Sequence, residues 1–289
     1  MQIIVPDYSI VDEVITRALH EDIGDGDHTS LATVPENATG KGRLLVKDDG
    51  IIAGVELALR IFNKVDPNLK IDVLINDGTP IKKGDIAFYV TGSSRSILTA
   101  ERLVLNFMQR MSGIATKTNQ LANLIADLPT QLLDTRKTTP GVRMMEKWAV
   151  KIGGGNNHRY ALYDMIMIKD NHVDYAGGIL EAIDRVESYQ KTEGKQLKVE
   201  IETRNIEEVL LVVKHGKVDR IMLDNFTPSE IEDALKVIPR DRFEVEASGG
   251  ITEDSIRQYA LTGVDFISSG ALTHSYQSLD LSLKADFNI

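Results

Sequence analysis

Hydrophobic and polar positions divide the chain into two stretches with different patterns. Before residue 128, the short apolar runs GRLLVKDDGIIAG, KIDVLINDG and DIAFYVTGSS are bounded by Gly, Asp and Asn and predict strands. Helical spacing of apolar residues predicts a helix over residues 9–20, followed by an acidic loop, and another over residues 55–65. We therefore expect a small sheet with helices on one face.

A long apolar pattern follows this predicted sheet. Residues 96–128 carry apolar side chains at helical spacing and have few helix breakers before Gly113. The pattern predicts one long helix, with a possible break at Gly113, that connects two domains.

After residue 128 the pattern changes to strands that alternate with helices. Six apolar runs predict strands: TQLLDTRK, DMIMIKDN, LKVEIET, DRIMLDNF, RFEVEASG and VDFISSGA. Such alternation is typical of an α/β fold with a parallel sheet whose faces are covered. A standard (β/α) barrel has eight strands, so six strands fit either a reduced barrel or an open sheet.

Composition narrows the classes of function. The 289 residues carry a formal net charge of -10 and include no cysteine, which excludes disulfides, thiolate metal sites and cysteine nucleophiles. The sequence lacks a lysine-arginine tract, an apolar stretch long enough to span a membrane and a recognisable targeting segment. We expect a cytoplasmic protein with no nucleic-acid or membrane partner.

Cations gather in one segment against this acidic background. Residues 134–170 hold eight of them: Arg136, Lys137, Arg143, Lys147, Lys151, His158, Arg159 and Lys169. A local excess of positive charge in an acidic protein favours an anionic substrate.

Polar residues also stand where the predicted strands end. The carboxyl ends of parallel strands hold the active site in α/β folds, so these residues should converge on one mouth. They are Arg136, Lys137, Lys169, Asp170, Glu202, Asp224 and Asn225.

Several of these residues have a catalytic and a plain structural interpretation. Arg136 and Lys137 can clamp a carboxylate or phosphate, or they can form a solvated basic turn. Lys169 ends a very apolar strand, so it must emerge at the mouth or be buried and paired. There it can bind an anion or form a Schiff base.

The three glycines at 153–155 precede Asn156, Asn157, His158 and Arg159. Backbone N–H groups can approach an anion there because no Cβ obstructs them. The alternative is a flexible connection between a helix and the next strand.

Carboxylates pair along two strands. Glu200 and Glu202 share a face by the two-residue period, as do Glu244 and Glu246. Together with Asp224 they can bind a metal, bind ribose hydroxyls, neutralise the cations or form a core salt-bridge network. Mg²⁺ is the expected ion, since it needs few carboxylates beside substrate phosphates.

Two Ser/Gly loops follow the last two predicted strands. They are Ser248-Gly249-Gly250 and Ser268-Ser269-Gly270. Barrel enzymes bind phosphate in this position through backbone N–H groups, although tight turns between strand and helix have the same composition.

Taken together, several motifs resemble the quinolinate phosphoribosyltransferase family: DTRKTTPG, EKWAVKIGGGNNHR, IKDNH, VEIE, LDN and EASGGI. EDIGDGDHTS, AERLVLNFMQRMSGIAT and GVDFISSGALTHS extend the resemblance over nearly the whole chain, with mild departures at Trp148 and Ala161.

The resemblance implies a fold and an activity. It implies an N-terminal α/β sandwich at residues 1–112, with residues 276–289 packing back on it, and an incomplete barrel of the type II phosphoribosyltransferase kind at residues 113–275. It implies transfer of the phosphoribosyl group of phosphoribosyl pyrophosphate (PRPP) to quinolinate, with decarboxylation, in a Mg²⁺-dependent homodimer.

The resemblance also assigns residues. Quinolinate would be held by Arg136, Thr138 or Thr139, His158, Arg159, Lys169 and, from the partner subunit, Arg102. PRPP would be held by Lys137, Glu202, Asp224, Ser248, Gly249, Gly250, Ser269 and Gly270. Lys137, Glu202 and Asp224 would be catalytic, and Glu202 and Asp224 would bind Mg²⁺, directly or through water.

Two rival functions stay open. A Schiff-base lyase would use Lys169 but does not need the surrounding arginines. Some relatives of the family are associated with molybdate transport, and they would be expected to lack parts of the quinolinate clamp.

Overall fold

The computed structural model describes residues 5–285 and divides the chain into two compact units. Of the described residues, the N-terminal unit comprises 5–119, 137–154 and 271–285. The barrel unit comprises residues 120–136 and 155–270. The chain therefore passes from the barrel unit to the N-terminal unit between Arg136 and Lys137.

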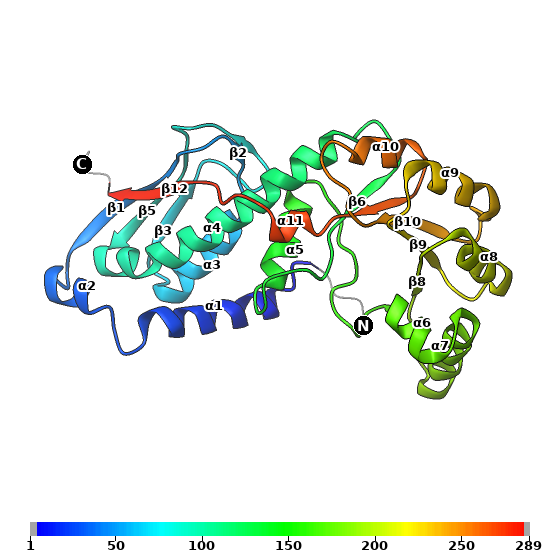
Figure 1. The fold of residues 1–289 in the computed structure, drawn as a ribbon. Helices are drawn as coiled ribbons and strands as arrows, with labels where there is room; N and C mark the ends of the chain where they lie inside the picture. The colour runs from blue at the N-terminus through cyan, green and yellow to red at the C-terminus, as the bar shows by residue number, and fades with distance from the viewer. Residues whose placement is uncertain (1–4, 286–289) are drawn as a thin grey trace. The chain divides into compact units, whose positions relative to one another are not determined.

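The N-terminal unit is built around a four-stranded antiparallel sheet of order β12-β1-β5-β3 (Figure 1). Its elements are α1 Tyr8–Ile23, α2 His28–Thr33, β1 Thr39–Val46, β2 Gly50–Ile51, α3 Val55–Val65, β3 Lys70–Val73, β4 Pro80–Ile81, β5 Ile86–Ser93, α4 Ser94–Asn123, α5 Arg143–Ile152, α11 Ala271–His274 and β12 Leu281–Ala285. The last turn of α4 belongs to the barrel unit.

Alternating burial along β1 explains why one face of this sheet is covered. Leu44 and Val46 are fully buried while their neighbours are partly exposed, as expected for a strand with one face on a core. Phe62 of α3 packs edge-on against Phe88 of β5, with ring centroids 6.0 Å apart. The predicted small sheet and the helix over residues 55–65 are thus confirmed.

Two local expectations are corrected. The segment after α1 is not only an acidic loop, because Asp27 caps the short helix α2 by accepting a hydrogen bond from the Ser30 backbone N–H. In addition, α4 continues through Gly113 without a break. A Cβ at Gly113 would lie 2.2 Å from the Gln277 carbonyl oxygen, so glycine serves close backbone packing there.

The barrel unit holds all six predicted strands in one parallel sheet of order β6-β11-β10-β9-β8-β7. Its elements are β6 Gln131–Leu133, β7 Ile166–Ile168, α6 Asp170–Ala176, α7 Ile179–Glu193, β8 Val199–Thr203, α8 Ile206–His215, β9 Arg220–Asp224, α9 Pro228–Val237, β10 Glu244–Ser248, α10 Ile256–Leu261 and β11 Phe266–Ser268. In the described part of the chain no ladder joins β6 to β7, so the barrel is incomplete.

Residues alternate between two environments along the central strands. On β9, Ile221 and Leu223 share one side, and the buried residues Val209 of α8 and Ile231 of α9 supply apolar cover for the sheet. The other side carries polar residues, including Arg220. The helices thus leave the second face for a polar interior.

Candidate active site

The register of the parallel sheet arranges the polar residues in rows. Glu200 of β8, Arg220 of β9 and Glu244 of β10 are paired and form one row. Glu202 is paired with Met222 in the next row, which also contains Glu246. Because side chains two residues apart point to the same face, these residues share the polar face of the sheet.

A third row lies at the carboxyl ends of the strands. Asp224 is paired there with Ser248. A two-residue step along a strand spans about 7 Å, so the Glu200 row lies below the mouth of the barrel and the Asp224 row lies at it. The polar face therefore has an inner level at the Glu200 row and an outer level at the Asp224 row. In the row between them, Glu246 contacts the inner residues Arg220 and His158, whereas Glu202 contacts Lys169 at the mouth, so we group Glu246 with the inner level and Glu202 with the outer one.

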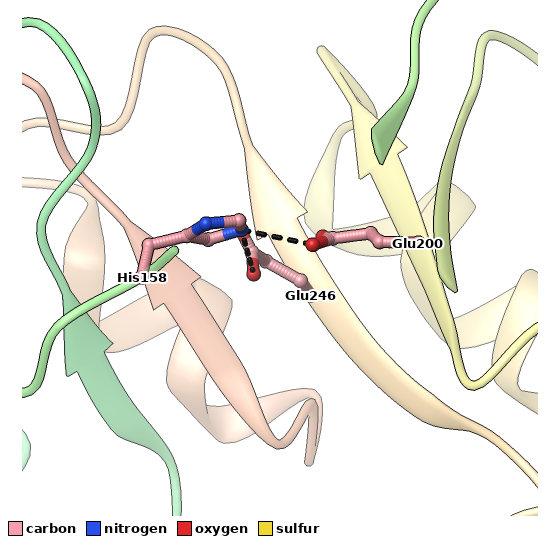
Figure 2. Close-up of side chains that lie close together, drawn as sticks. All are labelled: His158, Glu200 and Glu246. Carbon is pink, nitrogen blue, oxygen red and sulfur yellow. Dashed lines mark ion pairs between the residues drawn. The ribbon is translucent and has the colours of Figure 1, made fainter. Parts of the chain in front are cut away.

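A buried charge cluster occupies the inner level (Figure 2). His158 Nε2 lies 2.9 Å from Glu200 Oε2 and 3.5 Å from Glu246 Oε2. Arg220 Nη1 donates to Glu246 Oε2 at 3.0 Å and lies 4.0 Å from Glu200 Oε2. Both glutamates are fully buried, so the cluster must balance its charges internally.

The segment that carries His158 is tied to β6. Asn156 forms a parallel bridge with Leu133, and the buried carboxylate of Asp134 accepts hydrogen bonds from the His158 backbone N–H and from Asn157 Nδ2. The Arg159 backbone N–H donates to His158 Nδ1 at 2.7 Å. This contact turns the other ring nitrogen, Nε2, toward the two carboxylates.

The contacts of the two ring nitrogens favour different protonation states of His158. Burial lowers the pKa of His158, but Glu200 and Glu246 outweigh burial and raise that pKa to about 9. Nδ1 must be unprotonated to accept from the Arg159 amide, whereas the carboxylates favour the imidazolium. Burial and the charge of Glu246 raise the pKa of Glu200, whereas, against the effect of burial, His158 is among the groups that lower the pKa of Glu246. Carboxyl oxygens from both acids lie within 3.5 Å of Nε2 and outweigh one amide dipole, so they govern the protonation of the ring.

Arg159 and Arg136 bring two like charges together. Arg159 is largely buried and donates from Nη1 to the Met165 carbonyl oxygen. Burial, and then the positive charge of Arg136, lower the pKa of Arg159. Two adjacent guanidinium groups favour an anion between or beside them.

At the outer level a lysine and a carboxylate form an ion pair. Lys169 Nζ donates to Glu202 Oε1 at 2.6 Å. Lys169 stands at the N-cap of α6 and its side chain is 42% exposed, so it emerges at the mouth rather than being buried. The structure thus brings these two predicted site residues together.

Asp224 and the first Ser/Gly loop also meet at this level. Asn225 has a φ of 60°, which favours asparagine or glycine, and its side-chain amide donates to Asp224 Oδ2 at 2.7 Å. Its backbone N–H donates to the Ser248 carbonyl oxygen. A Cβ at Gly249, where φ is 96°, would lie 2.3 Å from Asn225 Oδ1, so only glycine fits.

The second Ser/Gly loop joins the same edge of the sheet through β6. The Ser269 backbone N–H donates to the Leu133 carbonyl oxygen at 3.0 Å, so this N–H serves the sheet. Gly270 ends the barrel unit, and Gly250 has a φ of 62° in the first loop. Both loops therefore lie at the carboxyl ends of strands, as predicted.

The three-glycine run has a packing role. A Cβ at Gly153 would lie 2.4 Å from the Ala115 carbonyl oxygen, so glycine lets the end of α5 approach α4. Gly154 has a φ of 92° just after this helix ends. Gly153 and Gly154 thus end α5 tightly against α4.

Three predicted site residues belong to the N-terminal unit. Arg102 is exposed on α4. Lys137 is exposed, and its carbonyl oxygen accepts from Thr273 Oγ1 at 2.9 Å. Thr138 Oγ1 accepts from Arg143 Nε at 2.8 Å.

Lys137 and Thr138 line a cavity of about 460 Å³ within this unit. Its other lining residues are Arg110, Thr139, Thr273, His274, Tyr276 and Ser278. Arg110 is held by the fully buried Glu146, whose Oε1 accepts from its Nε at 2.9 Å. Sequence reasoning missed Arg110 and His274, although both lie in motifs that carry the family resemblance.

One group in residues 5–285 has the geometry of a metal site, with ligand atoms of His158, Glu200 and Glu246 within 4.8 Å of one another. Arg220 already supplies a cation 3.0 Å from Glu246, so a salt-bridge network accounts for this cluster better than a metal does. Glu202 and Asp224 offer the hard carboxylate oxygens that Mg²⁺ prefers. Among the helices of the described chain, none is long and apolar enough to cross a membrane.

Comparisons with known proteins cover almost the whole chain. Residues 114–284 match the family profile described as quinolinate phosphoribosyl transferase, C-terminal domain. Residues 27–112 match the profile described as the N-terminal domain of the same enzyme.

Curated relatives and solved structures agree with these matches. Over 288 residues the chain is 49% identical to quinolinate phosphoribosyltransferase (decarboxylating) 1b of Nicotiana tabacum, covering 94% of this chain and 81% of that protein. It is 48% identical to the chloroplastic nicotinate-nucleotide pyrophosphorylase (carboxylating) of Arabidopsis thaliana, covering 94% and 82%. The crystal structure of NadC from Streptococcus pyogenes superposes with a TM-score of 0.90 at 36% identity and 98% coverage of each chain.

Proposed function

The chain belongs to the quinolinate phosphoribosyltransferase family, and from this premise we propose how its residues share the reaction. The enzyme transfers the phosphoribosyl group of PRPP to quinolinate with decarboxylation, which gives nicotinate mononucleotide, pyrophosphate and CO₂ for NAD biosynthesis. The observation that supports the residue assignment most strongly is the pairing of the buried Arg159 with the half-buried Arg136, whose charge acts on it. A dicarboxylate is the kind of ligand that two adjacent guanidinium groups require.

Quinolinate binding is assigned to the cations around this pair. Arg136, Arg159 and Lys169 supply positive charge, and Thr138 and His158 supply additional hydrogen-bonding groups. Arginine binds carboxylates by two parallel hydrogen bonds, so the pair can fix the ring as well as attract it. Holding the ring nitrogen at near-attack distance from the ribose can contribute about 7–11 kcal/mol to lowering the barrier.

PRPP binding is assigned to the outer level of the barrel and to Lys137. The Ser/Gly loops would bind the 5-phosphate, and their residues are Ser248, Gly249, Gly250, Ser269 and Gly270. Ser269 would contribute its hydroxyl, because its backbone N–H already donates to the Leu133 carbonyl oxygen. Lys137 would meet the pyrophosphate as a point charge. Glu202 and Asp224 would face the ribose.

The reaction requires both negatively and positively charged side chains. Loss of pyrophosphate leaves positive charge on the ribose, which the carboxylates of Glu202 and Asp224 can stabilise, while Lys137 offsets the charge of the leaving group. Attack by the pyridine nitrogen then makes a pyridinium. The positive ring nitrogen stabilises the electron pair left on C2 when CO₂ departs, and a proton from solvent then bonds to C2, so no decarboxylase cofactor is required.

We include Mg²⁺ as the cofactor. Glu202 and Asp224 would hold it, directly or through water, because carboxylate oxygens and substrate phosphates are its usual ligands. When bound, the ion would neutralise pyrophosphate charge.

The proposal includes a homodimer and a cytoplasmic location. Arg102 is exposed on α4, and we assign it to the active site of the partner subunit. The names of plant relatives place those proteins in chloroplasts or mitochondria, so the cytoplasmic location needs cell fractionation as its own test.

The two rival functions receive less support. An ammonium group paired with Glu202 at 2.6 Å is not the free amine that a Schiff base requires, which argues against a lyase using Lys169. A transport-associated relative would not be expected to keep Arg102, Arg136, Arg159 and Lys169 together.

The experiment that tests the activity uses two substrates in parallel. Purified protein is incubated with PRPP and Mg²⁺ and with either quinolinate or nicotinate, and nicotinate mononucleotide and CO₂ are measured. We expect product from quinolinate only, and loss of that product when EDTA removes the metal. Product from nicotinate alone, or from neither substrate, would contradict the proposal.

A further inference from the structure

Glu200 and Glu246, the buried glutamates below the mouth of the barrel, have no role in the proposed reaction. Glu200 and Glu246 are fully buried, and burying a carboxylate is costly unless hydrogen bonds and opposite charges compensate. Their compensation comes from Arg220 and from the ring of His158. Since a well-packed apolar core would avoid this cost, the acids call for a functional explanation.

We propose that Glu200, Glu246 and Arg220 are positioning residues for quinolinate, which hold the His158 ring by Nε2 and keep it protonated so that Nδ1 can donate to a substrate carboxylate. The inference rests on the proposed function, in which His158 belongs to the quinolinate site. It assigns a purpose to three residues that would not touch the substrate themselves.

The ring can serve an anion only in one protonation state. In the neutral ring with its proton on Nε2, Nδ1 is an acceptor and receives the Arg159 backbone N–H. A carboxylate would then face a lone pair and be repelled. In the protonated ring, Nδ1 carries a hydrogen, loses the contact with the amide, and offers a charge-assisted donor instead.

The geometry selects the protonated state. The carboxylate oxygens lie 2.9 Å and 3.5 Å from Nε2 and come from two different strands, β8 and β10, so the ring is held from two directions (Figure 2). Consistent with this arrangement, the pKa of His158 is raised to about 9 despite its burial. An isolated histidine would be mostly neutral at pH 8.

Arg220 keeps the two acids in place. It donates to Glu246 from Nη1 and to Glu244 from Nε and Nη2, and its guanidinium lies 4.0 Å over the ring of Phe266 on β11. It thus links three neighbouring strands and prevents the carboxylates from turning away from His158.

The other charged groups around the ring come from the remaining packed elements. Asp134, after β6, accepts from the Asn157 side-chain amide and the His158 backbone N–H, and Arg159 follows His158 directly in the chain. Arg136 contributes positive charge beside Arg159. The positive charges of Arg136 and Arg159 disfavour a further positive charge on His158, so protonation of the ring depends on the two glutamates.

The test compares two glutamates on one strand. Glu246→Gln removes a carboxylate that contacts His158, whereas Glu244→Gln removes one that pairs with Arg220 and Lys198. The KM for quinolinate is measured from pH 6 to pH 9.5 in wild type and both variants. The KM for PRPP is measured in parallel.

The expected result is a shift of the pH profile in one variant. Wild type and Glu244→Gln should keep a low quinolinate KM until about pH 9 and then lose affinity. Glu246→Gln should lose affinity on the order of tenfold at pH 8 and recover it near pH 6, where the ring is protonated again, with little change in the KM for PRPP. A structural defect would not be repaired by acid.

Other profiles would overturn the proposal. It fails if Glu246→Gln parallels wild type at every pH, or if Glu244→Gln shifts as far as Glu246→Gln does, since loss of the direct carboxylate contact with His158 would then not be the cause. A measurement on ligand-free wild type tests the proposal even if Glu246→Gln misfolds. The ¹⁵N resonances of His158, identified by their loss in His158→Gln, should titrate near pH 9. A midpoint near 6.5 would also overturn it. Absence of product from wild-type enzyme would instead reject the proposed function.

Discussion

At the residue scale, the two-residue period of strands explains most of the site. The spacing predicted that Glu200 and Glu202, and Glu244 and Glu246, would share a face, and the register of the sheet confirms this. The spacing could not show which acids lie at the mouth, because that depends on how neighbouring strands are aligned. It also could not show that the ring of His158 would contact the inner acids, since this contact depends on the path of the loop before it.

Arg136 gives the first prediction at this scale. Arg136→Ala should raise the KM for quinolinate and lower kcat, because a guanidinium that grips the carboxylate also orients the ring. A hydrogen bond to a charged group contributes about 1.5–3 kcal/mol, so its loss corresponds to a fall in kcat/KM of roughly tenfold to more than a hundredfold. Steady-state kinetics measure this effect, and kinetics equal to wild type would reject the assignment.

A matched control for this variant is Arg257→Ala. Arg257 forms an exposed ion pair with Asp127 in the same unit and has no place in the proposed site. Its replacement should leave both KM values within about twofold of wild type, since exposed ion pairs contribute little.

The raised pKa of His158 predicts how stability depends on pH. The folded-state pKa is about 9 and the model-compound value is 6.5, so the stabilising contribution is complete below pH 6.5 and is lost as pH rises through 9. Its size is on the order of 3 kcal/mol. Urea unfolding at pH 6 and pH 9.5 should therefore show a larger loss of stability in wild type than in Glu246→Gln. Equal losses would contradict the ion pairing.

At the element scale, the six strands of the barrel unit and the main helices were predictable, because long runs with a clear period are strong signals. The exceptions arose from tertiary contacts. Gly113 looked like a helix break, yet α4 passes through it because the chain near Gln277 packs against the helix there. Local sequence carries no sign of a partner more than 160 residues away.

Gly113→Ala tests this explanation. Alanine favours an exposed helix by about 1 kcal/mol relative to glycine. Here its Cβ would lie 2.2 Å from the Gln277 carbonyl oxygen and 2.9 Å from the Tyr276 ring, so we expect a net loss of about 1–3 kcal/mol in the free energy of unfolding. Denaturant unfolding measures it, with the exposed Gln120→Ala in the same helix as the control. A stabilised Gly113→Ala protein would reject the packing role.

At the scale of the whole molecule, the fold class was predictable and is confirmed by the solved relatives. The composition of the two units was harder to foresee. Residues 137–154 and the C-terminal segment join the N-terminal unit, and β12 pairs with β1 across more than 230 residues of sequence. Such long-range pairing depends on topology rather than on local propensity.

The proposed homodimer makes a quantitative prediction. If each site combines Lys137 of one subunit with Arg102 of the partner subunit, then Arg102→Ala and Lys137→Ala are each inactive alone. Each heterodimer regains one intact site. Random exchange at equal concentrations should restore roughly a quarter of wild-type activity. No recovery, with exchange shown by differently tagged subunits, would contradict a shared site.

The most direct test of the central claim is isothermal titration calorimetry of quinolinate into wild type, Arg159→Met and Arg240→Met. Methionine keeps much of the bulk and removes the charge. Arg240 is an arginine of the same unit that pairs with Asp265 at the amino end of β11, away from the carboxyl ends that form the mouth. If the cations at the mouth of the barrel bind the dicarboxylate, Arg159→Met should raise the Kd at least about tenfold while Arg240→Met leaves it unchanged. An unchanged Kd in Arg159→Met would contradict the account.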